Sequence, residues 1–291
     1  MRRGRAILML CGAAAASIAA VTYTVGWALS HPVPAHLGPP PPELGGASID
    51  IPSRSGATIR GWLTHGEGDR GAILLLPGVR ANRRSMLGRA RFLHDAGYTV
   101  LSIDFQASGE SAGEAITFGW RERFDVLAAV DRLRRDAPGR PIGIIGTSLG
   151  GAATLLAAPP LEVQAIVLEA VYPSIDAAVE NRLRLRAGAA GTLLAPLLLA
   201  QLGPRLGVRP SDLRPIDHIA SVRCPVFVVA GENDQHTTLA DTQRLFAAAR
   251  EPKTLWLIPG AAHIDYLQAT GDDYRHRILA FIDGAFRARL G

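Results

Sequence analysis

The sequence predicts an α/β fold with a mostly parallel central sheet flanked by helices on both faces. From Ser48 to the C-terminus, short runs of apolar, β-branched residues alternate with longer segments of helical spacing. This alternation is typical of repeated strand, helix and strand units. Gly and Pro stand at the ends of these runs, as they do between regular elements. A chain of 291 residues suits one large domain with a sizeable core.

The first element is an apolar helix over residues 1–30, predicted to be a signal anchor that crosses a membrane. The basic start MRRGR precedes Ala6 to Ser30, a stretch without a charged residue. A transmembrane helix needs about 20 apolar residues, whereas the apolar core of a cleaved signal peptide is typically about 7–15 residues long. Arginines before the helix predict a cytoplasmic N-terminus and an exported domain. The alternative is a cleaved signal peptide, with cleavage after Ala19 or Ala35.

A Pro-rich linker over residues 31–47 follows this helix and includes HPVPAHLGPPPPELGG. Prolines favour an extended, semi-rigid chain, so we expect the linker to hold the domain off the membrane. The domain, residues 48–291, is expected to begin with an antiparallel strand pair, ASIDIPSR and ATIRGWLTHG. The six strands expected after this pair are GAILLLPG, YTVLSIDF, PIGIIGTS, VQAIVLEA, PVFVVAGE and KTLWLIPG.

Helices are expected between these strands. They include Ser85–Ala96, Arg121–Arg135, Leu239–Ala249 and one that begins at Leu149. The alternation pauses at residues 172–222, a helix-rich segment that contains AGTLLAPLLLAQLG. Long insertions in compact α/β domains are often lids or binding elements, so we interpret residues 172–222 as a lid insertion over one end of the sheet.

Composition and missing motifs exclude several kinds of site. The formal net charge is +5, but no basic cluster is interleaved with aromatic residues, so no nucleic-acid partner is expected. Cys11 lies in the N-terminal apolar segment and Cys224 opens a predicted strand, so neither a disulfide nor a Cys-rich metal site is expected. The sequence has no H-E-x-x-H, no P-loop and no G-x-G-x-x-G after a strand. We therefore expect no metal and no nucleotide cofactor.

One serine stands out in IGIIGTSLGGAAT, between a predicted strand and the helix that follows it. A serine at this junction lies on a sharp turn that exposes its hydroxyl. Glycine is expected at Gly146 and Gly150, because a Cβ atom there would obstruct the close packing of helix and strand. These features predict that Ser148 is a nucleophile.

A serine nucleophile needs a base within hydrogen-bond reach and a third group that orients the base. Functional residues of an open parallel sheet collect beyond the carboxyl ends of its strands. His263 follows the last predicted strand and Asp234 follows the strand before it. The sequence therefore predicts a triad of Ser148, Asp234 and His263.

Other residues compete for these roles. Two more carboxylates lie near the same strand end, Glu232 and Asp241, but the first is closer to the strand and the second falls in the next helix. His236 is the main rival to His263; it shares a loop with Asp234 and is better suited to face solvent or substrate. Surface or supporting roles are expected for the remaining candidates, His65, His94 and His218.

Acyl transfer also needs backbone N–H groups directed at the developing oxyanion. The N–H of Leu149 is one candidate, because it directly follows the predicted nucleophile. The second is expected in the turn Pro77-Gly78-Val79-Arg80, where Gly78 lets the backbone approach closely and Val79 supplies the N–H group.

Together, the serine turn, the order Ser, Asp, His, the Pro-Gly turn, the segment DFQASGESAGE and the late insertion resemble the α/β-hydrolase superfamily. The resemblance is to the bacterial serine-hydrolase branch that includes serine aminopeptidases and lysophospholipase-like esterases, and it covers Ser48 to the C-terminus. It implies an α/β-hydrolase fold. The roles it implies are nucleophile Ser148, acid Asp234, base His263 and oxyanion donors Val79 and Leu149.

Two departures from that family pattern stand out. Pro77 occupies the position where the family usually has His before Gly, and Gln106-Ala107-Ser108 replaces the common Arg-Gly-His run after Asp104. Neither removes a catalytic group. Both are expected to alter the rim of the substrate pocket.

The resulting hypothesis is a serine hydrolase, a carboxylic ester hydrolase of esterase or lipase type, that works through an acyl-enzyme intermediate. A peptidase, an amidase or an acyltransferase would use the same triad. A non-catalytic binding protein on the same fold is the alternative from a different class. A dehalogenase is disfavoured, because that chemistry in this fold uses a carboxylate in place of Ser148.

The expected partners are a small acyl ester or lipid-like substrate and a membrane, and no oligomeric state is predicted. Leucines of the insertion could accept an acyl chain, and three arginines could meet anionic head groups, Arg182, Arg184 and Arg186. The expected location is a bacterial inner membrane, with the catalytic domain on the extracytoplasmic side. A secreted or periplasmic protein would result if the N-terminal segment is cleaved.

Overall fold

The computed structural model describes all residues except 1, 69, 158–160 and 289–291. Its centre is an eight-stranded sheet in the order β10-β9-β8-β7-β4-β5-β3-β2. The strands are β2 (Ala47–Pro52), β3 (Thr58–Thr64), β4 (Ala72–Leu76), β5 (Thr99–Ile103), β7 (Ile142–Thr147), β8 (Ala165–Glu169), β9 (Val226–Gly231) and β10 (Lys253–Ile258). β2 pairs antiparallel with β3, and β3 antiparallel with β5, while the other pairs are parallel. The predicted α/β fold with its mostly parallel sheet is confirmed.

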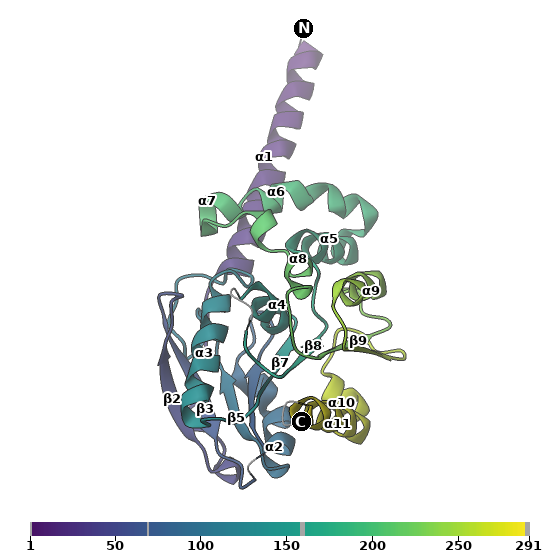
Figure 1. Ribbon diagram of the computed structural model, residues 1–291. Coiled ribbons are helices and arrows are strands. Elements are labelled where there is room, and N and C mark those ends of the chain that lie inside the picture. The colour runs from purple at the N-terminus through teal and green to yellow at the C-terminus, as the bar shows by residue number, and fades with distance from the viewer. Residues whose placement is uncertain (1, 69, 158–160, 289–291) are drawn as a thin grey trace.

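Helices cover both faces of this sheet (Figure 1). On one face lie α3 (Glu122–Asp136), α4 (Leu149–Leu156), α8 (Ile216–Ile219) and α9 (Leu239–Ala248), and on the other α2 (Leu87–Asp95), α10 (Tyr266–Thr270) and α11 (Asp272–Arg287). β4 shows why two cores form. Leu74 and Leu76 belong to the first core, and Ile73 and Leu75 to the second, because successive side chains of a strand point to opposite faces. A strand buried on both faces is apolar throughout.

Residues 170–225, here called the β8–β9 segment, rise from the end of β8 and return to β9 (Figure 1). They contain the helices α5 (Ile175–Gly191), α6 (Ala195–Leu199), α7 (Leu202–Leu206) and α8. α5 is interrupted at Ala187 and Gly188, whose backbone angles are not helical. The predicted insertion, residues 172–222, therefore consists largely of helices. Its role as a lid stays a prediction.

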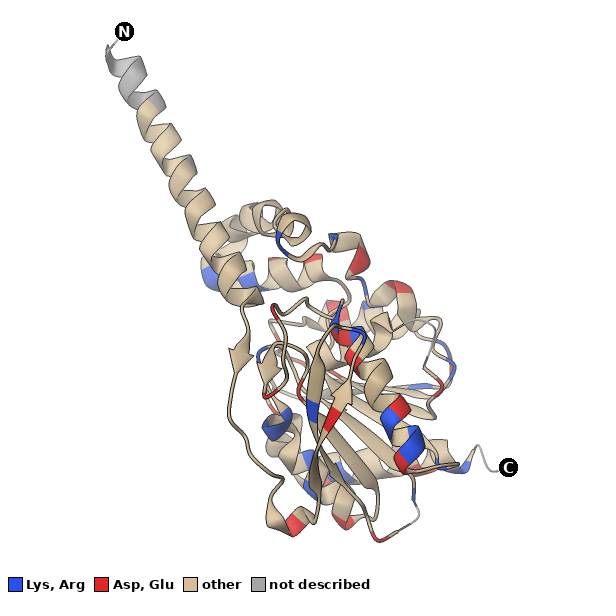
Figure 2. Ribbon diagram, turned by 90° about the vertical axis from the view of Figure 1, so that its left-hand side faces the viewer, with Lys and Arg blue, Asp and Glu red and all other residues tan. Residues whose placement is uncertain are grey.

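The N-terminal helix α1 (Arg2–Ser30) projects from the domain as a long rod (Figures 1 and 2). Its part from Met9 to Ser30 has a mean hydropathy of 1.5 and is long and apolar enough to cross a membrane. A signal sequence has the same properties. Large apolar side chains such as Met9 and Val21 are exposed along the rod. Met1, the first residue of the predicted anchor, and 289–291, the last of the predicted domain, lie outside the described residues.

The Pro-rich linker is extended as expected, but it packs along the domain. Its strand β1 (Val33–Pro34) pairs with β6 (Ser108–Gly109), and the side chain of Leu44 in the 3-10 turn Pro42–Leu44 is buried. Trp62 Nε1 donates a hydrogen bond to the carbonyl of Gly38 at 3.0 Å. The linker is therefore not a free spacer, and its expected role of holding the domain off a membrane stays a prediction. Apolar and backbone groups in the linker find partners on the domain surface.

Candidate active site

Ser148 lies on a sharp turn between β7 and α4. Its backbone has φ 49° and ψ −108°, a conformation that costs free energy for a residue with a Cβ atom and is typical of functional sites. The turn is held by a hydrogen bond from Ser148 N–H to the carbonyl of Glu169 at 2.7 Å. A Cβ atom on Gly146 would lie 2.6 Å from the Gly151 nitrogen, and one on Gly150 would lie 2.5 Å from the Leu76 carbonyl oxygen. Both glycines are thus required by close packing, as the sequence predicts.

The Ser148 hydroxyl is buried and makes no hydrogen bond to any of the described residues. An unpaired buried hydroxyl loses its bonds to water without replacement, which costs free energy. Hydrogen bonds of catalytic groups are often long or absent without substrate and tighten when it binds. The free hydroxyl of Ser148 is consistent with that behaviour.

Asp234 and His263 form a close pair at the carboxyl ends of β9 and β10. His263 Nδ1 lies 2.7 Å from Asp234 Oδ2, and the Asp234 side chain is fully buried. The other carboxylate oxygen, Oδ1, accepts the backbone N–H groups of His236 at 2.7 Å and Thr237 at 2.9 Å. These two bonds orient the carboxylate toward the imidazole. When Nδ1–H donates to the carboxylate, Nε2 is left free to accept a proton.

Ser148 and this pair lie at one edge of the sheet. β7, β8, β9 and β10 are consecutive parallel neighbours, so the loops after them converge at their carboxyl ends. Ser148 follows β7, while Asp234 and His263 follow β9 and β10. No hydrogen bond joins the Ser148 hydroxyl to His263 among the described residues.

His236 packs against His263, with ring centroids 5.0 Å apart. Burial, followed by the charges of Arg182 and His263, lowers the pKa of His236 below its ordinary value. A neutral ring is therefore favoured beside His263. The Nδ1 atom of His236 is buried and makes no hydrogen bond to the described residues, and the Oδ2 atom of Asp234 faces His263 instead.

The other competing residues have different surroundings. Asp241 caps α9, where its carboxylate accepts the Thr238 hydroxyl at 2.8 Å. Glu232 is exposed. The other candidate histidines lie after β3, in α2 and in α8, namely His65, His94 and His218.

The two predicted oxyanion donors lie next to the serine turn. Leu149 is the first residue of α4, and the first N–H groups of a helix have no partner within the helix. A Cβ atom built on Gly78 would lie 3.8 Å from the Ser148 Cβ atom, so the loop after β4 contacts the turn. Val79 follows Gly78 in this loop, and Arg80 after it has a positive φ of 60°.

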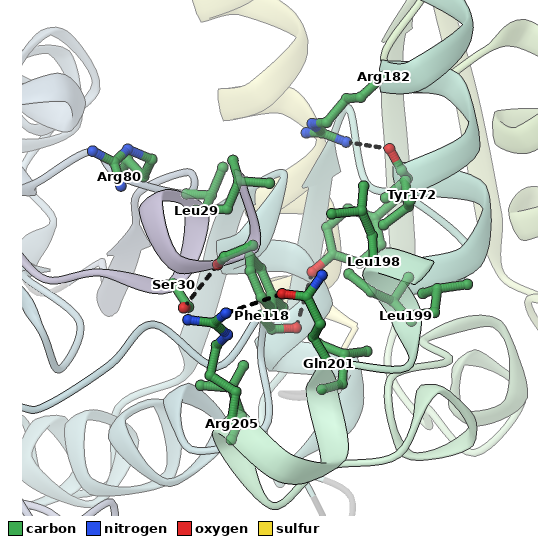
Figure 3. A pocket seen from close by; sticks show the side chains of 17 residues that line it. Leu29, Ser30, Arg80, Phe118, Tyr172, Arg182, Leu198, Leu199, Gln201 and Arg205 are labelled. Atoms are coloured by element: carbon green, nitrogen blue, oxygen red, sulfur yellow. Dashed lines mark hydrogen bonds between the residues drawn. The ribbon is translucent and has the colours of Figure 1, made fainter. Parts of the chain in front are cut away.

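Val79 lines a largely apolar cavity. The cavity is partly open to solvent and lies between the loop after β4, the β8–β9 segment and the end of α1. Figure 3 shows Leu29 and Ser30 of α1 beside Gln201 and Arg205. The two sequence departures, at Pro77 and at 106–108, are not among the residues that line this cavity, and their expected effect on the rim of a substrate pocket stays a prediction.

Gln106 has a structural role instead. Its side-chain amide donates to the Glu122 carboxylate at 2.7 Å, and its backbone N–H donates to Asp125 at 2.9 Å. Ser108 pairs with Val33 in the small β1–β6 sheet. This loop therefore fastens the linker and α3 to the domain.

The three arginines of α5 do not act as one group. Arg182 is half-buried, lines the cavity and donates to the Ala178 carbonyl at 2.9 Å. Burial lowers the pKa of Arg182 below its ordinary value. Arg184 and Arg186 are exposed. Of these three arginines, only Arg182 is therefore positioned to contact a molecule in the cavity.

A buried ionic cluster beneath the serine turn has no counterpart in the sequence prediction. The Glu169 carboxylate accepts the Thr147 hydroxyl at 2.8 Å and Arg89 Nη2 at 2.8 Å, and Arg89 also pairs with Asp265 at 3.0 Å. Tyr274 donates its hydroxyl to Glu169. Because Thr147 precedes Ser148, this cluster fixes the strand end that carries the turn. A glutamate at the end of the apolar run VQAIVLEA is the one sequence signal that points to it.

Within the described ranges, no group of three or more His, Cys, Asp or Glu side chains is arranged to hold a metal ion. Cys11 and Cys224 are both free thiols, the first exposed and the second partly buried.

Comparisons with known proteins agree with the fold. YqkD of Bacillus subtilis, an uncharacterized protein, is 26% identical over 237 residues, which cover 80% of this chain and 78% of YqkD. The uncharacterized protein Rv2307c of Mycobacterium tuberculosis is 30% identical over 224 residues, 76% of this chain and 73% of its own. A solved esterase structure from Pyrococcus furiosus superposes with a TM-score of 0.73 at 21% identity, covering 88% of this chain and 98% of the esterase. The sequence profile described as the alpha/beta hydrolase family matches residues 73–276. From β4 to α11, then, this chain belongs to the alpha/beta hydrolase family.

Proposed function

We propose that this protein is a serine-dependent carboxylic ester hydrolase that works through a Ser148, Asp234 and His263 triad. The observation that carries the proposal is the 2.7 Å contact between Asp234 and His263 at the sheet edge where Ser148 lies on a positive-φ turn. Family membership supports hydrolase chemistry. The triad and the ester specificity are our inference.

In the proposed mechanism the Ser148 hydroxyl oxygen attacks the ester carbonyl carbon while His263 Nε2 takes the hydroxyl proton. The oxyanion formed accepts hydrogen bonds from the N–H groups of Val79 and Leu149. As the carbon–oxygen bond to the alcohol breaks, His263 returns the proton to the leaving oxygen. Water then attacks the acyl-enzyme by the same route, releasing the acid and restoring Ser148.

An ester is preferred to a peptide because of the cavity next to Val79. Its lining is mainly apolar, with aliphatic side chains from α5, α6 and α7. Such a wall stabilises an acyl chain by burying it, whereas a peptide backbone against the aliphatic side chains would find few hydrogen-bond partners. Amide hydrolysis and acyl transfer use the same triad. They differ from ester hydrolysis in the substrate, which is an amide in the first, and in the acceptor, which replaces water in the second.

The cellular location of the protein is also a proposal. We infer that α1 is an uncleaved anchor in a bacterial inner membrane, with the catalytic domain on the extracytoplasmic side. Its length and hydropathy support a membrane span, and the arginines before the apolar stretch support a cytoplasmic N-terminus.

Labelling with a fluorophosphonate, which reacts with activated serines, tests the proposed function. Wild-type protein and the matched control Ser221→Ala, an exposed serine in the β8–β9 segment, should both be labelled and should hydrolyse p-nitrophenyl esters. Ser148→Ala should do neither. Equal labelling of Ser148→Ala and wild type would refute the assignment, and a folded wild type without labelling or turnover would favour a binding protein.

A further inference from the structure

The last turns of α1, residues 22–30, are fastened to the β8–β9 segment. Gln201 Nε2 donates to the Thr22 carbonyl at 3.0 Å, and Arg205 Nη2 donates to the Tyr23 carbonyl at 3.1 Å. The guanidinium of Arg205 also lies over the Tyr23 ring, 4.3 Å from its centroid. Gln201, the residue just before α7, and Arg205, within α7, thus both bind the backbone of α1.

The other side of α1 is fastened to the active-site loops. Arg80, in the loop that carries Val79, donates to the Ala28 carbonyl at 2.5 Å. The Ser30 carbonyl accepts the N–H of Ile116 at 2.8 Å, and the Ser30 side chain is buried. The end of α1 therefore contacts both the proposed oxyanion loop and the β8–β9 segment.

Gly26 allows this close approach. A Cβ atom at this position would overlap the side-chain amide of Gln201. Gly12, in the same helix, has no atom within 4 Å of its Cβ position. Of these two glycines, only Gly26 lies where a Cβ atom would meet another side chain.

This end of α1 also forms part of the cavity. Gly26, Leu29 and Ser30 line it, and Figure 3 shows Leu29 and Ser30 across from Tyr172 and Arg182 of the β8–β9 segment. Val79 lines the cavity too, so the space runs from the proposed oxyanion loop toward α1. A chain bound by its carbonyl at Val79 would have α1 beside it.

We propose that residues 22–30 of α1 are one wall of an acyl-chain site, so that the apolar N-terminal helix determines which esters the enzyme prefers. The inference rests on the proposed function and adds a substrate class: esters whose acyl chain is long enough to reach from Val79 to Leu29. Two leucines of the β8–β9 segment are exposed, Leu193 just before α6 and Leu197 in α6, and α6 contacts α1. Cleavage after Ala35 would remove the wall, whereas cleavage after Ala19 would leave it.

The test uses the full-length protein with Gly26→Leu and the matched control Gly12→Leu. The first places a side chain between α1 and Gln201, and the second places the same side chain where nothing contacts it. Hydrolysis of p-nitrophenyl dodecanoate and p-nitrophenyl acetate is measured in the same detergent. We expect the ratio of their kcat/KM values to fall at least tenfold in Gly26→Leu and to stay within twofold of wild type in Gly12→Leu. An unchanged ratio in both variants would overturn the proposal, including the case in which Gly26→Leu loses activity on both esters equally.

A binding measurement separates this inference from the proposed chemistry. In a Ser148→Ala background, a fluorescent undecanoic acid probe reports acyl-chain binding without turnover. Adding Gly26→Leu should weaken probe binding at least tenfold, and adding Gly12→Leu should not. If wild type hydrolyses no ester but this binding difference is present, the proposed function fails and the acyl-chain site stands. Equal binding in the two double variants would refute the site.

Discussion

Replacement of Asp234 by Asn tests how the proposed base is oriented. Asp234 Oδ1 accepts two backbone N–H groups, at 2.7 and 2.9 Å, while Oδ2 faces His263 Nδ1 at 2.7 Å. An asparagine can satisfy both N–H groups only by keeping its oxygen there, which turns its NH2 group toward His263. If the amide were reversed, its NH2 group would face the two backbone N–H groups, and no acceptor would remain for them. This would cost about 1–3 kcal/mol for each unsatisfied group.

The expected result is therefore an imidazole of the wrong tautomer. With a donor facing Nδ1, the ring proton moves to Nε2, which can no longer accept the proton of Ser148. The equivalent change in a serine-protease triad lowers kcat by about 10⁴, or about 5.4 kcal/mol at 1.36 kcal/mol per tenfold. We expect a loss of that size in p-nitrophenyl ester hydrolysis, with little change in the thermal unfolding midpoint.

Glu232→Gln is the control for this change, because Glu232 is an exposed carboxylate two residues away. It should keep wild-type kcat. Asp234→Asn protein that is folded and retains more than a tenth of wild-type kcat, while Ser148→Ala is inactive, would refute the proposed orientation of His263.

Three further predictions follow from packing, burial and charge. Gly150→Ala should destabilise the fold by about 1–3 kcal/mol, because its Cβ atom would lie 2.5 Å from a β4 carbonyl oxygen. The control Gly284→Ala in α11, with no atom within 4 Å of its Cβ position, should stabilise the fold by about 0.5–1 kcal/mol. Similar denaturation midpoints for the two variants would contradict this prediction. Burial raises the pKa of Asp125 to about 7, so the folded state holds a proton that the unfolded state releases near pH 4. The free energy of unfolding should then fall by about 1.4 kcal/mol per pH unit as the pH rises from about 4 to about 7. In the Asp125→Asn variant, thermal unfolding at pH 5 and at pH 7 should differ less than in the wild type. Arg182→Ala should lower kcat/KM for anionic lipid esters severalfold while Arg184→Ala does not, and equal effects would argue against contact in the cavity.

The sheet and the serine turn were predictable because they depend on local patterns. Each strand is a short apolar run between turn residues, and Gly146 and Gly150 follow from the space at one strand-to-helix junction. The pairing of Asp234 with His263 followed from their positions after parallel strands. All of these signals lie within a few residues of the feature they predict.

Long-range polar contacts left no comparable signal. Nothing in the sequence distinguishes Arg89 from an exposed helix residue, yet its side chain is buried against Glu169, 80 positions away. The contacts of Gln201 and Arg205 with α1 join residues 179 and 182 positions apart. A contact between a side chain and a distant backbone carbonyl produces no periodic pattern in the sequence. The sequence therefore does not predict that α1 and the linker dock on the domain.

The docked end of α1 also changes how the domain would sit on a lipid bilayer. Residues 6–21, the apolar part before the contacts with Gln201 and Arg205, rise about 24 Å at 1.5 Å per residue. The hydrocarbon core of a bilayer is about 30 Å thick. A spanning α1 is therefore too short by about one helical turn unless the domain is drawn inward, a hydrophobic mismatch. Drawing it inward would bring the β8–β9 segment, which holds this end of α1, toward the lipid head groups, so that a lipid-like substrate would reach the cavity from the membrane side.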